Sequence, residues 1–168
     1  LHLKEPYFME DNLIVDVAPP RVETLPETCN AGLAERFSFD NATGVPSLWR
    51  RFSDHLTETS HGSADVRYGV CYDVNGAEDF RYMAGVEVAS SAASPSDFSA
   101  VTLPKGRYAV YEHRGHIADL RKTIFTIWHK ALPDSSLAYR HAPDFERYDR
   151  RFDPDTGEGL VEIWMPID

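Results

Sequence analysis

The sequence has only two cysteines, Cys29 and Cys71, in 168 residues. Two thiols cannot form the disulfide framework that stabilises small secreted domains, and no C-x-x-C pair or His/Cys cluster indicates structural zinc. No apolar run approaches the about 18 residues that a membrane helix needs, and no basic start precedes a short apolar stretch. These absences predict a cytoplasmic protein with no membrane contact, no cofactor and no metal, in which both cysteines are buried thiols.

Basic residues are also scarce. Lys and Arg number 17 against 27 Asp and Glu, so the formal net charge is -10. This charge disfavours non-specific contact with nucleic-acid phosphates and attracts cationic ligands or basic protein surfaces. The apolar fraction of 42% is ordinary for one globular domain. Composition alone leaves open whether the acidity only solvates the surface or also serves a cationic partner.

Familiar catalytic motifs are missing as well. The chain contains no G-x-S-x-G, no H-E-x-x-H and no glycine-rich phosphate loop. His113 and His116 stand three residues apart, a spacing that resembles a metal site. They straddle a predicted strand end and Gly115, with no third ligand nearby, so the sequence does not predict a metal centre.

The periodicity of apolar residues predicts two helices and six strands. Residues 1–20 are expected to be an N-terminal tail or linker, whether native or introduced, because Pro19 and Pro20 end a stretch without a period. Helical spacing runs from Val45 to Leu56 and from Ile117 to Ala131. Alternation predicts strands at 28–38, 66–73, 80–88, 107–114, 145–152 and 160–167.

A shift of about 79 residues superposes the two helices and lays Trp49 on Trp128. The sequence therefore predicts an α+β fold, a tandem β-α-β-β repeat with pseudo-two-fold symmetry. Its antiparallel sheet would carry two helices on one face and a ligand groove on the other. The domain would span 21–168, with halves at about 21–89 and 99–168 and a linker at 90–98.

Alternation along the strands also predicts a binding surface. On the last strand Val161 and Ile163 would face the helices, which leaves Glu162 and Trp164 on the opposite side. Aromatic residues and carboxylates from three strands are predicted to share that surface: Glu146, Tyr148, Trp164, Tyr111 and Glu162. Such a surface suits a flat cationic or polar small molecule. The same residue types also serve as plain packing in sheets, so alternation alone leaves both roles open.

Several segments resemble one family. Residues 103–115, LPKGRYAVYEHRG, resemble the opening of the second half of GyrI-like domains, which are the effector-binding domains of AraC-type and multidrug-sensing regulators. The segments 22–26, 67–70, 144–148 and 161–167 fit the same pattern in the same order. The resemblance covers roughly residues 21–168 and implies a small-molecule groove between two related halves. It also implies that Glu146 pairs with cationic aromatic ligands.

The resemblance leaves three functions open. The first is a small-molecule binding domain, either standing alone or excised from a transcription regulator. In this case the chain would not bind nucleic acid directly, because the 20 residues before the domain cannot hold a DNA-reading helix pair. The second is a hydrolase of strained, cyclopropane-containing natural products, with Glu146 and then Glu162 as candidate catalytic carboxylates. The third is an acidic inhibitor that docks on a DNA-binding enzyme such as gyrase. A protein partner or a dimer stays open.

Overall fold

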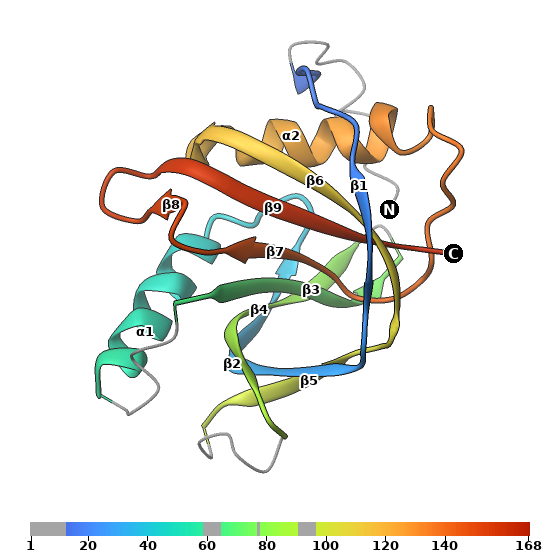
Figure 1. Ribbon diagram of the computed structural model, residues 1–168. Coiled ribbons are helices and arrows are strands. Elements are labelled where there is room, and N and C mark those ends of the chain that lie inside the picture. Colours follow the sequence, from blue (N-terminus) through green and yellow to red (C-terminus); the bar gives the residue numbers. More distant parts are fainter. Residues whose placement is uncertain (1–12, 59–64, 77, 91–96) are drawn as a thin grey trace.

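The computed structural model describes residues 13–58, 65–76, 78–90 and 97–168. Its strands form one antiparallel sheet that curls into a half-barrel (Figure 1), in the order β1-β6-β9-β7-β3-β4-β2-β5, with β8 paired to β9. The strands are β1 Arg21–Leu25, β2 Thr28–Ser38, β3 Arg67–Asn75, β4 Asp79–Val88, β5 Ser99–Leu103, β6 Gly106–His116, β7 Asp144–Tyr148, β8 Phe152–Asp153 and β9 Glu158–Ile167.

Both predicted helices are confirmed. The first is α1, Val45–Glu58. The second begins as the 3-10 turn η5, Ile117–Asp119, continues as α2, Leu120–Thr126, and ends as the π turn η6, Ile127–Ala131. Among the described residues, no helix is both long and apolar enough to cross a bilayer.

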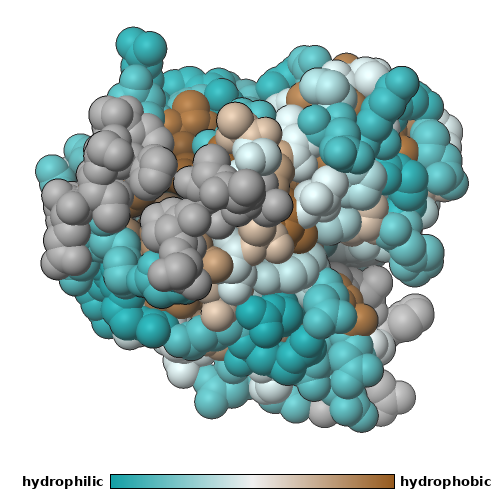
Figure 2. All heavy atoms as spheres, turned by 90° about the horizontal axis from the view of Figure 1, so that it is seen from below, coloured by the Kyte–Doolittle hydropathy of each residue, from teal (hydrophilic) through white to brown (hydrophobic). Residues whose placement is uncertain are grey.

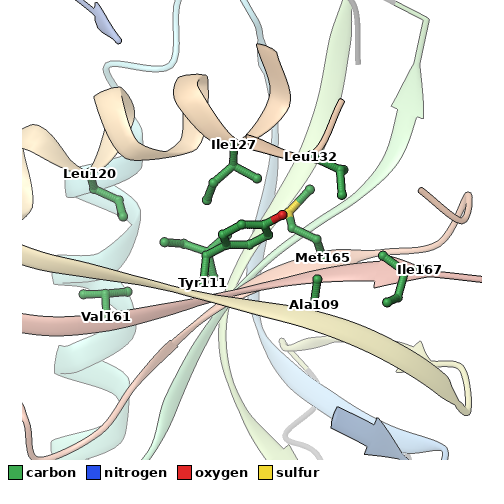
Figure 3. Close-up of a cluster of buried hydrophobic side chains, with 9 residues drawn as sticks. Ala109, Tyr111, Leu120, Ile127, Leu132, Val161, Met165 and Ile167 are labelled. Carbon is green, nitrogen blue, oxygen red and sulfur yellow. The ribbon is translucent and has the colours of Figure 1, made fainter. Parts of the chain in front are cut away.

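The two helices cover the same face of the sheet. The helical segment around α2 buries one apolar cluster against β6 and β9 (Figure 3): Ala109, Tyr111, Leu120, Ile127, Leu132, Val161, Ile163, Met165 and Ile167. The helix α1 buries a second cluster against β2 and β4: Phe37, Leu48, Phe52, Leu56, Phe80, Tyr82, Ala84 and Val86. Each helix therefore stabilises one end of the sheet by removing apolar area from water.

The opposite face carries a third apolar cluster: Val70, Met83, Leu103, Tyr108, Val110, Phe145 and Trp164. The rings of Phe145 and Trp164 stack there with centroids 5.4 Å apart and planes 15° apart. The face predicted to hold an open groove is thus closed at its centre by packed aromatic rings.

Three segments differ from the sequence-based prediction. The strand β5 was not predicted; it pairs with β2 and is only five residues long. The predicted strand 145–152 is split into β7 and β8, because Asp149 accepts hydrogen bonds from the backbone and guanidinium of Arg151 and turns the chain. Part of the expected tail is docked, since Leu13 is buried and Thr126 accepts a 3.0 Å bond from the Val15 amide. Residues 1–12 and the linker residues 91–96 lie outside the described part.

Candidate functional site

A strip of sheet between the two helices carries the polar residues of greatest interest. The contacts of α1 with the sheet are mainly with β2 and β4, and those of α2 with the sheet are mainly with β6. The strands β3 and β7 lie between these covered regions at the centre of the sheet (Figure 1). The residue Glu146 on β7 pairs with Gly69 on β3 and with Ile163 on β9. Because Ile163 packs beneath α2, Glu146 points to the helix-covered face.

Two tyrosine hydroxyls converge on the carboxylate of Glu146. The hydroxyl of Tyr82 donates to Oε1 at 2.9 Å, and that of Tyr148 donates to the same atom at 2.6 Å. The indole Nε1 of Trp49, from α1, donates in turn to the Tyr82 oxygen at 3.0 Å. The rings of Trp49 and Tyr148 meet edge to face at 5.2 Å. These four residues, called the Glu146 cluster below, join the region under α1 to the region under α2.

Gly69 makes the Tyr82 contact sterically feasible. A Cβ atom on Gly69 would lie 2.0 Å from the Tyr82 hydroxyl and 2.8 Å from Oε1 of Glu146. Real Cβ contacts are not that short, so any side chain here would push the tyrosine and the carboxylate apart. The hydrogen bond between Tyr82 and Glu146 therefore passes directly over the backbone of β3 at Gly69.

Burial controls the ionisation of the cluster. It raises the pKa of Glu146, and the hydrogen bonds from Tyr148 and Tyr82 only partly counteract it. Burial beside the charge of Glu146 also holds the pKa values of Tyr82 and Tyr148 well above their ordinary value. Both tyrosines therefore keep their protons and act as donors. Within the described residues, no lysine or arginine pairs with Glu146, so the site holds a half-buried anion without a counter-charge.

A second carboxylate lies next to this cluster. Asp144 is two residues before Glu146 on β7 and pairs in register with Cys71 on β3. Burial, followed by the charge of Glu146, raises its pKa from 3.8 to about 7. Burial together with the nearby Asp144 charge also raises the pKa of Tyr139 to about 12, and the Tyr139 ring contacts Trp128 edge to face at 4.9 Å.

The predicted surface of five residues is corrected by the structure, because its members lie on two faces. Glu162 and Trp164 point away from the helices. Glu162 is 2% exposed and pairs with Arg21 at 2.6 Å, Arg151 at 3.2 Å and Arg147 at 3.6 Å. Its pKa is lowered because bonds from Arg21 and Trp164 outweigh the effect of burial. Glu162 is therefore an anchor of an ion network and not a free carboxylate.

Tyr111 is also separated from Glu146. It does face the helices, but its ring lies beneath α2 among aliphatic side chains (Figure 3) and is only 1% exposed. Of the five predicted residues, Glu146 and Tyr148 bond to each other on the helix-covered face, and Glu162 and Trp164 bond to each other on the opposite face.

The sequence analysis did not identify three residues of the site: Asp144, Trp49 and Tyr82. Asp144 could have been found, because it shares the alternation of Glu146 and Tyr148. Trp49 had a signal in its equivalence to Trp128 in the shifted alignment. Tyr82 had none, because its contact with Glu146 crosses 64 residues of sequence and an intervening strand.

The two histidines with metal-like spacing have other partners. His113 contacts the Thr123 hydroxyl through Nδ1 and the His116 carbonyl through Nε2. The Nδ1 atom of His116 accepts from the Ala118 amide. In the part of the chain that the structure describes, no group of three or more His, Cys, Asp or Glu side chains is arranged to hold a metal ion.

Known proteins resemble both the sequence and the fold. The transcriptional regulator BrlR of Pseudomonas aeruginosa is 31% identical over 134 residues, which cover 77% of this chain and 49% of BrlR. The chain thus spans about half the length of this curated relative. The structure of SAV2435 bound to tetraphenylphosphonium matches 92% of this chain and 94% of SAV2435, with a TM-score of 0.71 at 20% identity. The EcmrR C-terminal domain matches 92% of this chain and 99% of its own length, with a TM-score of 0.60 at 12% identity.

The curled sheet with two helices agrees with the family assignment that the sequence gives. The sequence pattern of the GyrI-like small molecule binding domain matches residues 18–168, which is nearly the whole described chain. The chain belongs to the GyrI-like small molecule binding domain family.

Proposed function

We propose that the chain binds small aromatic cations at the Glu146 cluster. The observation that carries this proposal is the half-buried carboxylate of Glu146, which has two tyrosine donors and no counter-charge among the described residues. An anion in such a place gains most from a ligand that brings its own positive charge. The neighbouring Trp49 and Tyr148 offer ring faces and edges to an aromatic ligand.

A structural relative supports the ligand class. SAV2435 was solved with tetraphenylphosphonium, a cation surrounded by aromatic rings. The fold is shared at 20% identity, so the transfer to this chain is part of the proposal. The net charge of -10 would add a favourable long-range field for any cation.

Calorimetric titration with tetraphenylphosphonium tests the proposal. The parent protein is expected to bind one equivalent. Glu146→Gln should weaken this binding by about tenfold or more, since one charge-assisted contact is lost in a poorly solvated place. Neutral triphenylphosphine oxide should bind weakly, with the same affinity for parent and variant.

Glu158→Gln serves as the matched control, because Glu158 is an exposed carboxylate on β9 and its replacement changes the net charge equally. It should leave the affinity unchanged. If Glu146→Gln bound tetraphenylphosphonium as tightly as the parent, the role of charge pairing would be refuted.

We further propose that this binding serves a transcription regulator in the cytoplasm, with the chain as its effector-binding part. The 31% identity to BrlR and the coverage of only 49% of that protein support this role. The chain itself should not bind DNA, given its net charge of -10. A gel-shift assay at physiological salt is expected to show no complex.

We also propose that the domain is a tandem repeat, with halves at about 21–89 and 99–168. The strand order supports it: if β1, β2, β3 and β4 are matched with β5, β6, β7 and β9, the order is the same from either edge. Each half also lends its first strand to the other, since β1 pairs with β6 and β5 pairs with β2. Separately expressed halves should then form one heterodimer and should not fold individually.

Hydrolysis is the alternative at the same site. The raised pKa of Glu146 beside Asp144 favours it, because a carboxylate with a raised pKa can act as a general acid or base. Incubation with a reactive cyclopropane compound and mass spectrometry would detect product. Conversion that is lost in Glu146→Gln would support the enzyme, and absence of product would leave only the binding role.

A further inference from the structure

The site contains two carboxylates, and the second has no assigned purpose. Asp144 and Glu146 are separated by one residue on β7, so their side chains leave the same face roughly 7 Å apart along the strand. Both are half-buried. Within the described residues, neither forms an ion pair with a lysine, arginine or histidine; the side-chain charge that acts most on Asp144 is that of Glu146.

Each carboxylate has its own aromatic neighbours. Trp49 and Tyr148 flank Glu146 on the side of α1. The charge of Asp144 helps to raise the pKa of Tyr139, and the ring of Tyr139 contacts that of Trp128 in η6. The strip therefore has two ends of similar chemistry, one near each helix.

A ligand with a single positive charge can neutralise only one end. The other carboxylate then has no positive partner in a poorly solvated place, which is unfavourable. A ligand with two positive centres at the carboxylate spacing compensates both, and a flat aromatic body between the centres would lie along β7 between the two sets of rings.

We propose that the preferred ligand of this site is a flat aromatic dication whose positive centres pair with Glu146 and Asp144. This inference rests on the proposed cation-binding function and narrows its ligand class. It assigns to Asp144 the role of a second anchor that decides between singly and doubly charged ligands of equal shape.

Two compounds of nearly equal shape provide the test. Methyl viologen carries a positive nitrogen at each end of a rigid bipyridine, and N-methyl-4-phenylpyridinium keeps the shape with one of the two charges. Both are titrated calorimetrically into the full chain at about 0.15 M salt, which screens the general negative field. The pH is about 8, above the value of about 7 to which burial raises the pKa of Asp144.

The parent is expected to prefer methyl viologen by about tenfold or more, the effect of one additional charge contact. Asp144→Asn should reduce this preference to near one while it retains the affinity for the monocation. Asp155→Asn removes an equal charge from the exposed turn between β8 and β9 and should keep the full preference. Thermal unfolding of each variant verifies that it is folded.

The outcomes separate the two proposals. Equal affinity of the parent for both compounds, or an undiminished preference in Asp144→Asn, would overturn the dication inference and leave the cation-binding function intact. Failure of the parent to bind the monocation and tetraphenylphosphonium as well would overturn the proposed function and the inference with it.

Discussion

The hydroxyl of Tyr82 on β4 reaches Oε1 of Glu146 on β7, 2.9 Å away, across the whole width of β3. It does so above Gly69, the one position of β3 that pairs directly with Glu146. The donor is on β4, the acceptor is on β7, and β3 lies between them. The geometry of this hydrogen bond depends on the absence of a side chain at Gly69.

Gly69→Ala is therefore expected to disrupt the hydrogen bond between Tyr82 and Glu146. The new methyl group would occupy the place of the Tyr82 hydroxyl, whose ring is buried and cannot swing freely. We expect tetraphenylphosphonium affinity to fall about tenfold and thermal stability to decrease, since overpacking costs about 1–3 kcal/mol. In the Tyr82→Phe background the same change should be milder, because the clashing oxygen is gone. Equal losses in both backgrounds would show that the glycine matters for another reason.

Asp144 should make stability depend on pH. Its pKa is about 7 in the folded protein, raised by burial and then by Glu146, against an ordinary value of 3.8. Between these pH values the folded protein retains a proton that the unfolded chain has released, so stability falls as pH rises from about 4 to about 7. In urea titrations at about pH 5 and pH 8, Asp144→Asn should lose less stability than the parent by roughly 1–3 kcal/mol.

Among the described residues, the side chains that interact with Asp144 do not reverse this sign. Glu146 has a raised pKa and contributes in the same direction, while the Tyr139 hydroxyl and Cys71 thiol, both with raised pKa values, stay protonated throughout. The exposed Asp155→Asn variant should follow the parent at both pH values. An equal loss of stability between these pH values in Asp144→Asn and in the parent would contradict the raised pKa of Asp144.

Glu162 is expected to contribute to stability but not to ligand binding. Arg21 reaches it from the edge strand β1 across β6, at 2.6 Å, and Glu162 itself is 2% exposed. Glu162→Gln should lower stability by roughly 1–3 kcal/mol, because a buried charge partner is removed and the arginines are partly solvated. Tetraphenylphosphonium affinity should not change, since Glu162 lies on the face away from Glu146.

The surface arginine Arg36 provides the comparison for Glu162. It pairs with Asp73 and Asp79 while 41% exposed, and Arg36→Ala should cost no more than about 1 kcal/mol. A loss of ligand binding in a folded Glu162→Gln protein would show that Glu162 takes part in ligand binding after all.

The described surface exposes few large hydrophobic side chains. Figure 2 shows hydrophilic residues surrounding smaller apolar patches on one face. Among the described residues, only three large hydrophobic side chains are exposed: Ile14, Val22 and Val74. Scattered exposure of this kind is ordinary for a monomer, whereas the gyrase-inhibitor hypothesis rests on the net charge of -10 and stays a prediction.

Alternation predicted the architecture well because it is a local property. It correctly separated Val161 and Ile163 from Glu162 and Trp164, and helical spacing found both helices. The register between strands is not local. The pairing of Phe145 with Trp164 places Glu146 beside Ile163, on the helix-covered face, and one residue of slip would have reversed this. The sequence therefore predicted Glu146 and Tyr148 but not the face to which they belong.

His113, finally, is expected to stabilise the fold through hydrogen bonds to the Thr123 hydroxyl and the His116 carbonyl. A carbonyl can only accept, so Nε2 of His113 donates to the His116 oxygen at 2.9 Å, and Nδ1 accepts from the Thr123 hydroxyl at 2.7 Å. The side chains of His113 and Thr123 are buried, whereas that of His116 is exposed. Thr123→Val keeps the shape but leaves Nδ1 unpaired, which should cost about 1–3 kcal/mol in urea unfolding. Thr24→Val, at an exposed position of β1, should change stability by under about 0.5 kcal/mol. Zinc should leave the unfolding midpoint of the parent unchanged, because both ring nitrogens of His113 are already bonded there; a midpoint that rises with zinc in the parent would show that the pair binds metal instead.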